Sequence, residues 1–167
     1  MTAPATGSAD LGAAGPRVRA AVRADLPQVA VPAAEHAAYE RAAPPAEGLA
    51  ELLAAELFER AEPRLSCLVA ELPGGVLAGY ATCTEEFSTW QGRAHLHLDC
   101  LYLRDEHRGL GLGGLVIGAV VAEAGARGLA EVQWNTPVWN EGAIRFHDRL
   151  GATRKEKQRY SLAVPQA

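Results

Sequence analysis

The sequence predicts an α+β fold, in which helices pack on one mixed β-sheet. Short apolar runs alternate with longer segments whose apolar residues recur at helical spacing, in the order strand, helices, three strands, helix, strand, helix, strand. The chain has 167 residues, of which 49% are hydrophobic, so it is long enough to bury the core of one domain. We therefore expect one domain over residues 17–167, preceded by a loose Gly-, Ala- and Pro-rich tail over residues 1–16.

The elements expected in the first half are a strand at Arg17–Arg23, a helix at Leu26–Arg41, a helix from Leu49 to Arg60 and a strand at Leu65–Glu71. Asp25 and Gln28 have the spacing of a capping box and predict the start of the first helix. Pro32 interrupts that helix, so we expect a kink or two short pieces. The second helix follows from leucines repeated at helical spacing.

The elements expected in the second half are strands at Val76–Phe87 and Ala94–Leu103, a helix at Gly113–Arg127, a strand at Val132–Asn135, a helix at Glu141–Leu150 and a last strand at Arg154–Leu162. Glycines punctuate this half of the chain. Gly74 and Gly75 form a turn after Pro73, while Gly128 and Gly151 stand where helix C-caps are expected.

Composition excludes several classes of partner. A formal net charge of −4 gives no basic footprint for nucleic acid, and no apolar run approaches the ~20 residues that a membrane span needs. The N-terminus lacks the charged and apolar regions of a secretory signal. Three cysteines, an odd number, each lie in a strand-like run without zinc-site spacing, as expected for reduced thiols in a cytoplasmic protein.

The glycine-rich stretch Arg104–Leu115 is the strongest local signal. It follows a predicted strand and opens onto a predicted helix. The first turn of a helix has unsatisfied N–H groups and carries partial positive charge, and glycines let a phosphate approach those amides closely. The stretch therefore predicts an anion-binding helix N-terminus.

Three phosphate motifs, or a glycine-rich turn without ligand, compete for this stretch. A P-loop requires Lys-Ser or Lys-Thr after its last glycine, whereas Leu115 follows here. The glycines match G-x-G-x-x-G literally, but a charged run separates them from the strand, and Glu131 precedes the next strand instead of ending it. The third pattern, Arg-x-x-Gly-x-Gly, is met by Arg108, Gly111 and Gly113 and resembles the pyrophosphate loop of the GNAT acetyltransferases.

A second segment strengthens that resemblance. Trp139–His147 and Leu150–Ala152 are similar to the W-N-x-x-A-I-x-F-Y…L-G-A signature of the polyamine and thialysine N-acetyltransferase branch. Together with further similarity, the resemblance covers most of Val18–Tyr160. It implies a GNAT-like fold with a mixed, mostly antiparallel central sheet flanked by helices, acetyl-CoA as cosubstrate, and a homodimer.

The resemblance also implies a cofactor site. The strand Leu98–Leu103 is expected to splay from Val132–Asn135, which makes a slot where its backbone pairs with the pantetheine arm, while the glycine amides take the pyrophosphate. The residues expected at acetyl-CoA are Leu101, Tyr102, Leu103, Arg108, Gly109, Leu110, Gly111, Leu112, Gly113, Gly114 and Asn140.

Acetyl transfer to an amine requires a group that takes a proton from the protonated amine and a group that protonates the leaving sulfur. Asp99, at the family's acidic strand position, is our candidate for the first, as a base or by orienting a water or the amine. His147 stands where the family has its acidic tyrosine, and an imidazole titrates near neutrality. The alternatives are that His147 only packs, and that Tyr102 or Tyr160 is the acid.

Acidic and aromatic residues are expected to form the acceptor pocket. Glu40 and Glu85, with Asp99, would attract a cationic substrate, and Trp90 would form a wall unless it is core. The histidines His95 and His97 alternate with Asp99 along one strand and share a face until a bulge breaks the phase. We expect a polar rim there and no metal, since a fourth ligand is not apparent.

The sequence therefore predicts an acetyl-CoA-dependent N-acetyltransferase that acts on the primary amine of a small molecule. A polyamine, a diamine, a thialysine-like amino acid and an amine-bearing natural product are all candidates. The alternatives are an acyltransferase that uses another acyl-CoA and a non-catalytic acyl-CoA-binding or regulatory module.

Overall fold

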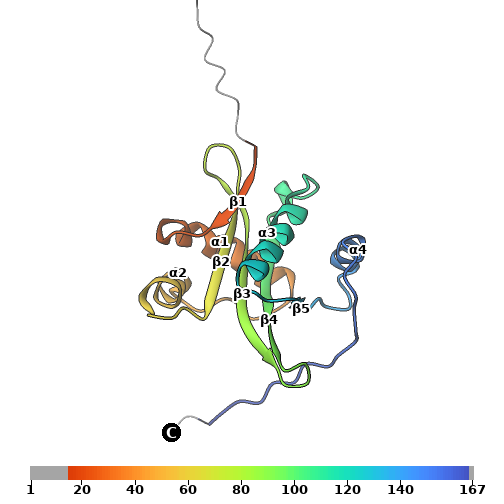
Figure 1. Cartoon of the computed structure of the whole chain (residues 1–167). Helices are drawn as coiled ribbons and strands as arrows, with labels where there is room; N and C mark the ends of the chain where they lie inside the picture. The colour runs from red at the N-terminus through yellow and green to blue at the C-terminus, as the bar shows by residue number, and fades with distance from the viewer. Residues whose placement is uncertain (1–14, 166–167) are drawn as a thin grey trace, which may run out of the picture. The chain divides into compact units, whose positions relative to one another are not determined.

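A computed structural model describes residues 15–165, so most of the expected tail, residues 1–14, lies outside the described residues. The strands are β1 (Arg17–Ala20), β2 (Leu65–Glu71), β3 (Leu77–Ser88), β4 (Arg93–Leu103) and β5 (Val132–Trp134) (Figure 1). The helices are α1 (Leu26–Tyr39), α2 (Leu49–Ala54), α3 (Leu112–Ala126) and α4 (Glu141–Arg149). The strands form one sheet in the order β1-β2-β3-β4-β5. Strands β1 to β4 are antiparallel and β5 is parallel to β4, which confirms the predicted mixed, mostly antiparallel sheet.

The long hairpin of β3 and β4 is the centre of the sheet. Residues 79–82 of β3 pair with residues 100–103 of β4, and residues 83–88 pair with residues 93–98. Asp99 is thus one extra residue on β4, a β-bulge between the partners of Thr82 and Cys83. The alternation of side chains along β4 shifts by one at this point.

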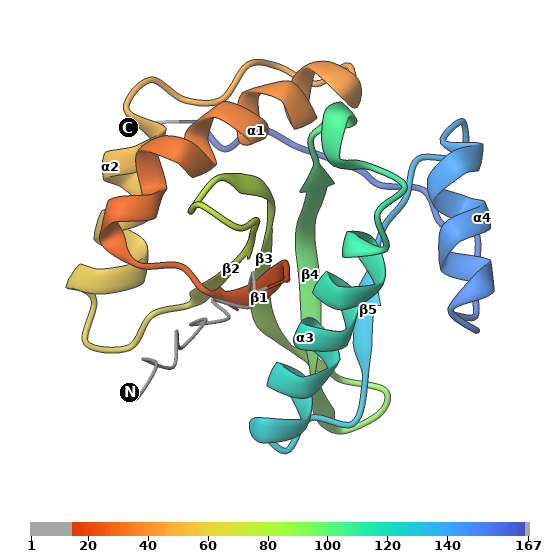
Figure 2. The same ribbon diagram turned by 90° about the horizontal axis from the view of Figure 1, so that it is seen from above.

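Two apolar layers cover the sheet. On one face Tyr80 and Tyr102 pack with Val29 of α1, and the partly buried Leu53 of α2 and Leu57 of the following turn join them. On the other face α3 runs along β4 (Figure 2), and Leu96 of that strand is fully buried. The apolar content of α3 is explained by this core position, since both faces of the sheet bury side chains.

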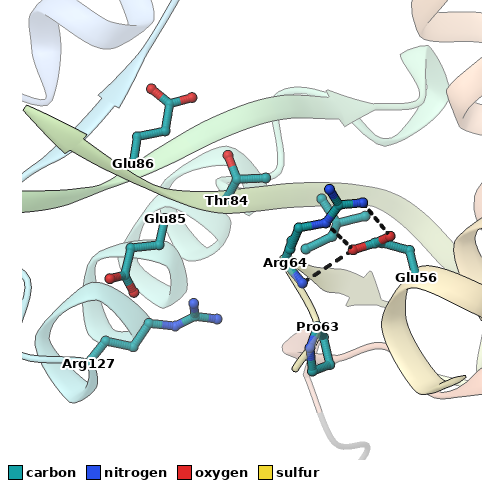
Figure 3. Close-up of a pocket in the computed structure, with 8 residues that line it drawn as sticks. Glu56, Pro63, Arg64, Thr84, Glu85, Glu86 and Arg127 are labelled. Carbon is teal, nitrogen blue, oxygen red and sulfur yellow. Dashed lines mark hydrogen bonds and ion pairs between the residues drawn. The ribbon is translucent and has the colours of Figure 1, made fainter. Parts of the chain in front are cut away.

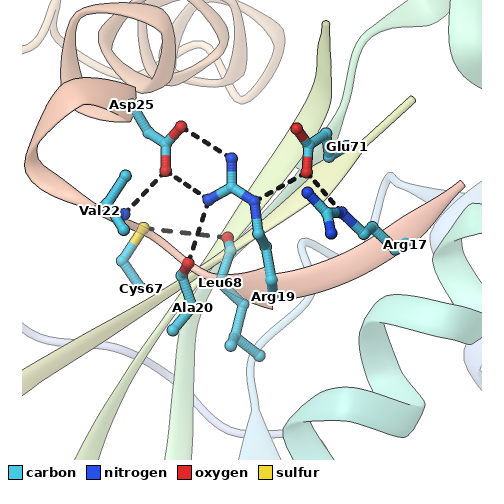
Figure 4. A network of polar contacts seen from close by, with 8 residues as sticks. All are labelled: Arg17, Arg19, Ala20, Val22, Asp25, Cys67, Leu68 and Glu71. Carbon is cyan, nitrogen blue, oxygen red and sulfur yellow. Dashed lines mark hydrogen bonds and ion pairs between the residues drawn. The ribbon is translucent and has the colours of Figure 1, made fainter. Parts of the chain in front are cut away.

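A network of charged residues connects β1 to the start of α1 (Figure 4). Arg19 donates to both carboxylate oxygens of Asp25, at 2.6 and 3.0 Å, and to Glu71 at 2.8 Å. The Asp25 carboxylate also accepts from the Val22 amide at 2.8 Å. The Asp25–Gln28 capping box is therefore wrong, because this carboxylate closes the preceding 3-10 turn instead of capping α1.

Two further predictions about helices need correction. Helix α1 is continuous through Pro32, so the alternative of two short pieces is wrong, and it ends at Tyr39, before the left-handed residue Arg41. A proline removes one backbone hydrogen bond, which the buried face of this helix tolerates. The second helix is α-helical only to Ala54, and a π-helical turn completes it at Ala55–Glu59.

The predicted last strand at Arg154–Leu162 is wrong, since residues 152–165 have neither helix nor strand. A strand requires a neighbour that satisfies its backbone groups, and none of the described strands pairs with this segment. The other predicted strands and helices agree with the structure within one or two residues at most ends, although β1 stops at Ala20 instead of Arg23.

The chain divides between Asn135 and Thr136 into two compact units. The first contains the sheet with α1 to α3, and the second contains α4. No helix within residues 15–165 has the length and apolar character needed to cross a bilayer.

Candidate active site

Strands β4 and β5 part where the cofactor slot was predicted. They pair only from Leu96 opposite Val132 to Leu98 opposite Trp134. Beyond that point β4 continues for five residues to Leu103, and no strand among residues 15–165 pairs with its β5-facing edge there. Backbone groups on this edge are therefore placed to pair with an extended ligand such as a pantetheine arm.

The glycine loop follows at the end of β4 and opens α3. Gly109 and Gly111 both have a φ of +77°, in the left-handed region that favours glycine. Gly111 is the N-cap of α3, and no side chain caps the helix there. The first turn of this 15-residue helix thus has no side-chain cap, which is compatible with the predicted anion site.

Arg108 fixes the loop to the sheet. Its Nε donates to the Leu103 carbonyl at 2.9 Å, and its guanidinium lies 5.1 Å from the ring centres of both Tyr39 and Tyr102. The same side chain pairs with Asp105 at 2.5 Å. Arg108 therefore holds the loop against β4 and occupies the Leu103 carbonyl, one of the groups expected to pair with pantetheine.

Asp99 is exposed at the bulge and touches a buried polar chain. The Cys100 thiol lies 3.6 Å from the Asp99 carboxylate, and burial raises the pKa of Cys100 to about 11, so the thiol keeps its proton. Cys100 also interacts with the Tyr80 hydroxyl, which lies 3.3 Å from Nδ1 of His36. The other ring nitrogen of His36 lies 3.5 Å from Glu40.

This series of polar side-chain contacts connects Asp99 to Glu40, two residues that the sequence analysis assigned to the site separately. Burial raises the pKa of Tyr80, so its hydroxyl stays protonated and can donate to His36 or accept from it. Sequence reasoning missed both Tyr80 and His36. The spacing of four between His36 and Glu40 on one helix was the available signal, whereas Tyr80 required the strand register.

The remaining predicted acceptor residues lie apart from that chain. Trp90 is in the turn between β3 and β4 and is 99% exposed, so it is not core. Glu85 pairs with the core residue Leu96, on the face opposite to Glu86, and extends toward Arg127 at the end of α3 (Figure 3).

Glu85 lines an open hollow of about 640 Å³. The hollow is lined by Glu56, Pro63, Arg64, Leu65, Thr84, Glu85, Glu86 and Arg127. Arg64 holds Glu56 with two contacts of 3.1 Å, which neutralises part of its charge. Because Arg127 and the glycine loop are at opposite ends of α3, some ~22 Å of helix separates them. This hollow is therefore not adjacent to the glycine loop.

The second unit contains the last two predicted residues. Asn140 is the N-cap of α4, and its side-chain oxygen accepts from the Ala143 amide at 3.1 Å. Nδ1 of His147 lies 3.2 Å from the Thr136 hydroxyl. Burial lowers the pKa of His147, against the opposing effect of Asp148. The imidazole is therefore neutral at pH 7, which favours a base or a neutral hydrogen-bond donor over a charged acid.

Comparison with known proteins finds matches over most of the chain. The model of the Acetyltransferase (GNAT) family matches residues 33–152. The chain is 31% identical to thialysine N-epsilon-acetyltransferase of Bos taurus over 71% of its own length and 72% of that protein.

One further curated relative and one solved structure also match this chain. Tyramine N-feruloyltransferase 10/30 of Nicotiana tabacum is 33% identical over 54% of this chain, which corresponds to only 40% of that protein. The crystal structure of a possible acetyltransferase from Clostridium difficile 630 superposes with a TM-score of 0.75 at 16% identity, over 92% of this chain and all of that one. At that identity the structural likeness concerns the fold alone.

Proposed function

Because this chain belongs to the GNAT acetyltransferase family, we propose that it is an acetyl-CoA-dependent N-acetyltransferase that acts on the primary amine of a small molecule. The observation that carries the proposal is the parting of β4 from β5 directly before a glycine loop that opens α3. A strand edge without a partner suits the pantetheine arm, and the helix N-terminus suits the pyrophosphate. Acetyl-CoA contains both a pantetheine arm and a pyrophosphate.

The amine acceptor would be deprotonated beside the bulge. Asp99 is an exposed carboxylate on β4, two residues before Leu101 at the expected pantetheine edge. The amine passes its proton to this carboxylate or to a water that it orients, and the free amine then attacks the thioester carbonyl. The polar chain through Tyr80 and His36 supplies further hydrogen-bond partners on the same face. Glu40, at its end, adds negative charge for a cationic acceptor.

His147 would donate a hydrogen bond to the leaving sulfur, since a neutral ring keeps its last N–H proton near pH 7 and stabilises the thiolate without protonating it. If the Thr136 hydroxyl donates to Nδ1, the proton of the neutral ring is on Nε2, which is then the nitrogen that would make this hydrogen bond. His147→Ala should then lower kcat with little change in substrate binding, and His147→Tyr should retain activity. A near-normal kcat for His147→Ala across about pH 6 to 9 would instead leave Tyr102, Tyr160 or water as the donor.

The alternatives differ in acyl group and in catalysis. The relative named for feruloyl transfer to tyramine favours testing a bulkier acyl-CoA as donor. A non-catalytic acyl-CoA-binding module is the other alternative, because the family's tyrosine is replaced by His147.

A panel of amines tests the proposal. Thiol release from acetyl-CoA is measured with a polyamine, a diamine, thialysine, ornithine and tyramine, and then with feruloyl-CoA as donor. Turnover with one amine and acetyl-CoA supports the enzyme, while tight acetyl-CoA binding without turnover supports the non-catalytic module. Asp99→Asn should lower kcat/KM for the amine by about 100-fold or more and leave acetyl-CoA affinity close to wild type. Glu62→Gln, which removes another exposed carboxylate, is the control.

We further propose a homodimer in the cytoplasm. The outer edge of β5 pairs with no strand among the described residues, and Tyr160 and Leu162 of the C-terminal segment are 89% and 95% exposed. Both features suit a second copy of the chain. Cys67 and Cys83 are buried free thiols, as in a reducing compartment. Sedimentation that gives a monomer at micromolar concentration would contradict the dimer.

A further inference from the structure

Three metal-ligating side chains meet near the turn of the β3–β4 hairpin. Glu86 of β3 is directly opposite His95 of β4, and His97 lies two residues further along β4 on the same face. One donor atom from each of the three lies within 4.8 Å of the other two. The strand register brings them together before the bulge at Asp99 breaks the alternation.

One ring nitrogen of His95 has no hydrogen-bond partner among residues 15–165. His95 is only 5% exposed, and its Nδ1 is buried without a partner. Its Nε2 lies 3.7 Å from the Glu86 carboxylate, beyond hydrogen-bond distance. Buried ring nitrogens are normally satisfied, and an unsatisfied one in a folded protein points to a bound water or ion. Nε2 is the ring nitrogen near the Glu86 carboxylate, so it is the donor that an ion among the three side chains would bind.

We propose that Glu86, His95 and His97 bind a divalent first-row transition-metal ion, with Zn²⁺ as the ion to test. Two imidazoles and one carboxylate are a donor set that zinc and other ions of this series accept, with further positions for water. Bonds of about 2.1 Å place the donor atoms of a tetrahedral site some 3.4 Å apart. Glu86 is exposed enough to close the remaining separation by rotation of its side chain.

This proposal departs from the expectation of no metal for a structural reason. In the sequence, Asp99 alternates with His95 and His97 and would be the third ligand. The bulge interrupts this alternation before Asp99, and the strand register places Glu86 opposite His95 instead. None of its three residues belongs to the glycine loop. An ion there would join β3 to β4 at the end of the sheet next to Asp99.

Metal binding by the full-length protein tests the proposal. The protein is treated with chelator and dialysed, and Zn²⁺ affinity is then measured by calorimetry, together with the melting temperature with and without Zn²⁺. We expect a raised melting temperature, and at least about tenfold weaker Zn²⁺ binding for His95→Ala and for His97→Ala. His97→Ala is the safer variant, because His97 is less buried than His95.

Matched controls separate this site from general metal binding. Glu86→Gln should weaken Zn²⁺ binding, whereas Glu85→Gln, the adjacent glutamate on the opposite face (Figure 3), should not. His107→Ala removes a histidine elsewhere and should also leave the affinity unchanged. Co²⁺ should give visible bands without a thiolate charge-transfer band. Equal Zn²⁺ affinity in wild type and His97→Ala, or a thiolate band, would overturn the proposal.

Discussion

Substitution of Gly111 by alanine tests the glycine loop directly. An added Cβ would meet no atom within 4 Å, so the protein itself offers no clash. The cost is conformational, because a φ of +77° is left-handed and costs an L-residue about 1 to 2 kcal/mol. If the loop leaves this conformation in the free protein, acetyl-CoA binding must restore it. At 1.4 kcal/mol for each factor of ten, the Kd for acetyl-CoA should rise about 5- to 30-fold.

Calorimetry with acetyl-CoA measures this Kd, and circular dichroism checks that the variant folds. Gly118→Ala is the matched control: it is exposed in α3, its φ is not positive, and an added Cβ meets nothing within 4 Å. Alanine there should stabilise the helix by up to about 1 kcal/mol and leave the Kd unchanged. A folded Gly111→Ala protein with wild-type Kd would refute the reasoning that these amides bind the cofactor in the observed conformation.

Three further predictions concern stability and its dependence on pH. Gly79→Ala places a Cβ 2.1 Å from the Tyr102 carbonyl oxygen, so the end of β4 must move; we expect about 1 to 3 kcal/mol of destabilisation in urea, with weaker acetyl-CoA binding. Asp25→Ala loses two hydrogen bonds from Arg19 and one from the Val22 amide, and should lower the melting temperature by about 6 to 12 °C, equivalent to about 3 kcal/mol. Hydrogen bonds from Arg19 lower the pKa of Asp25, so its contribution is present above the unfolded value of 3.8 and is lost as the pH falls below it; an unchanged acid-unfolding midpoint in Asp25→Ala would contradict this. Burial lowers the pKa of His147, so the unfolded chain takes up its proton first and stability falls as the pH drops below about 6.5; melts of His147→Gln should lack this part of the fall.

The sequence by itself predicted most of the elements and the position of the glycine loop. Periodicity identified β2 with its observed bounds and α3 to within one residue, because apolar spacing reports which face of an element is buried. The left-handed φ of Gly109 and Gly111 agrees with their choice as loop residues, since a side chain is disfavoured there. These properties are local, so they can be read from neighbouring residues.

Only the tertiary structure decided which of these residues share a site. The bulge at Asp99 and the register of β3 against β4 depend on pairing between segments that are distant along the chain. In that register Tyr80 lies beside Cys100 and Glu86 lies opposite His95. Glu85, paired with Leu96, is on the face of the sheet opposite to Glu86. The segment Arg154–Leu162 makes the same point, because a strand-like pattern does not become a strand until a neighbour satisfies its backbone hydrogen bonds.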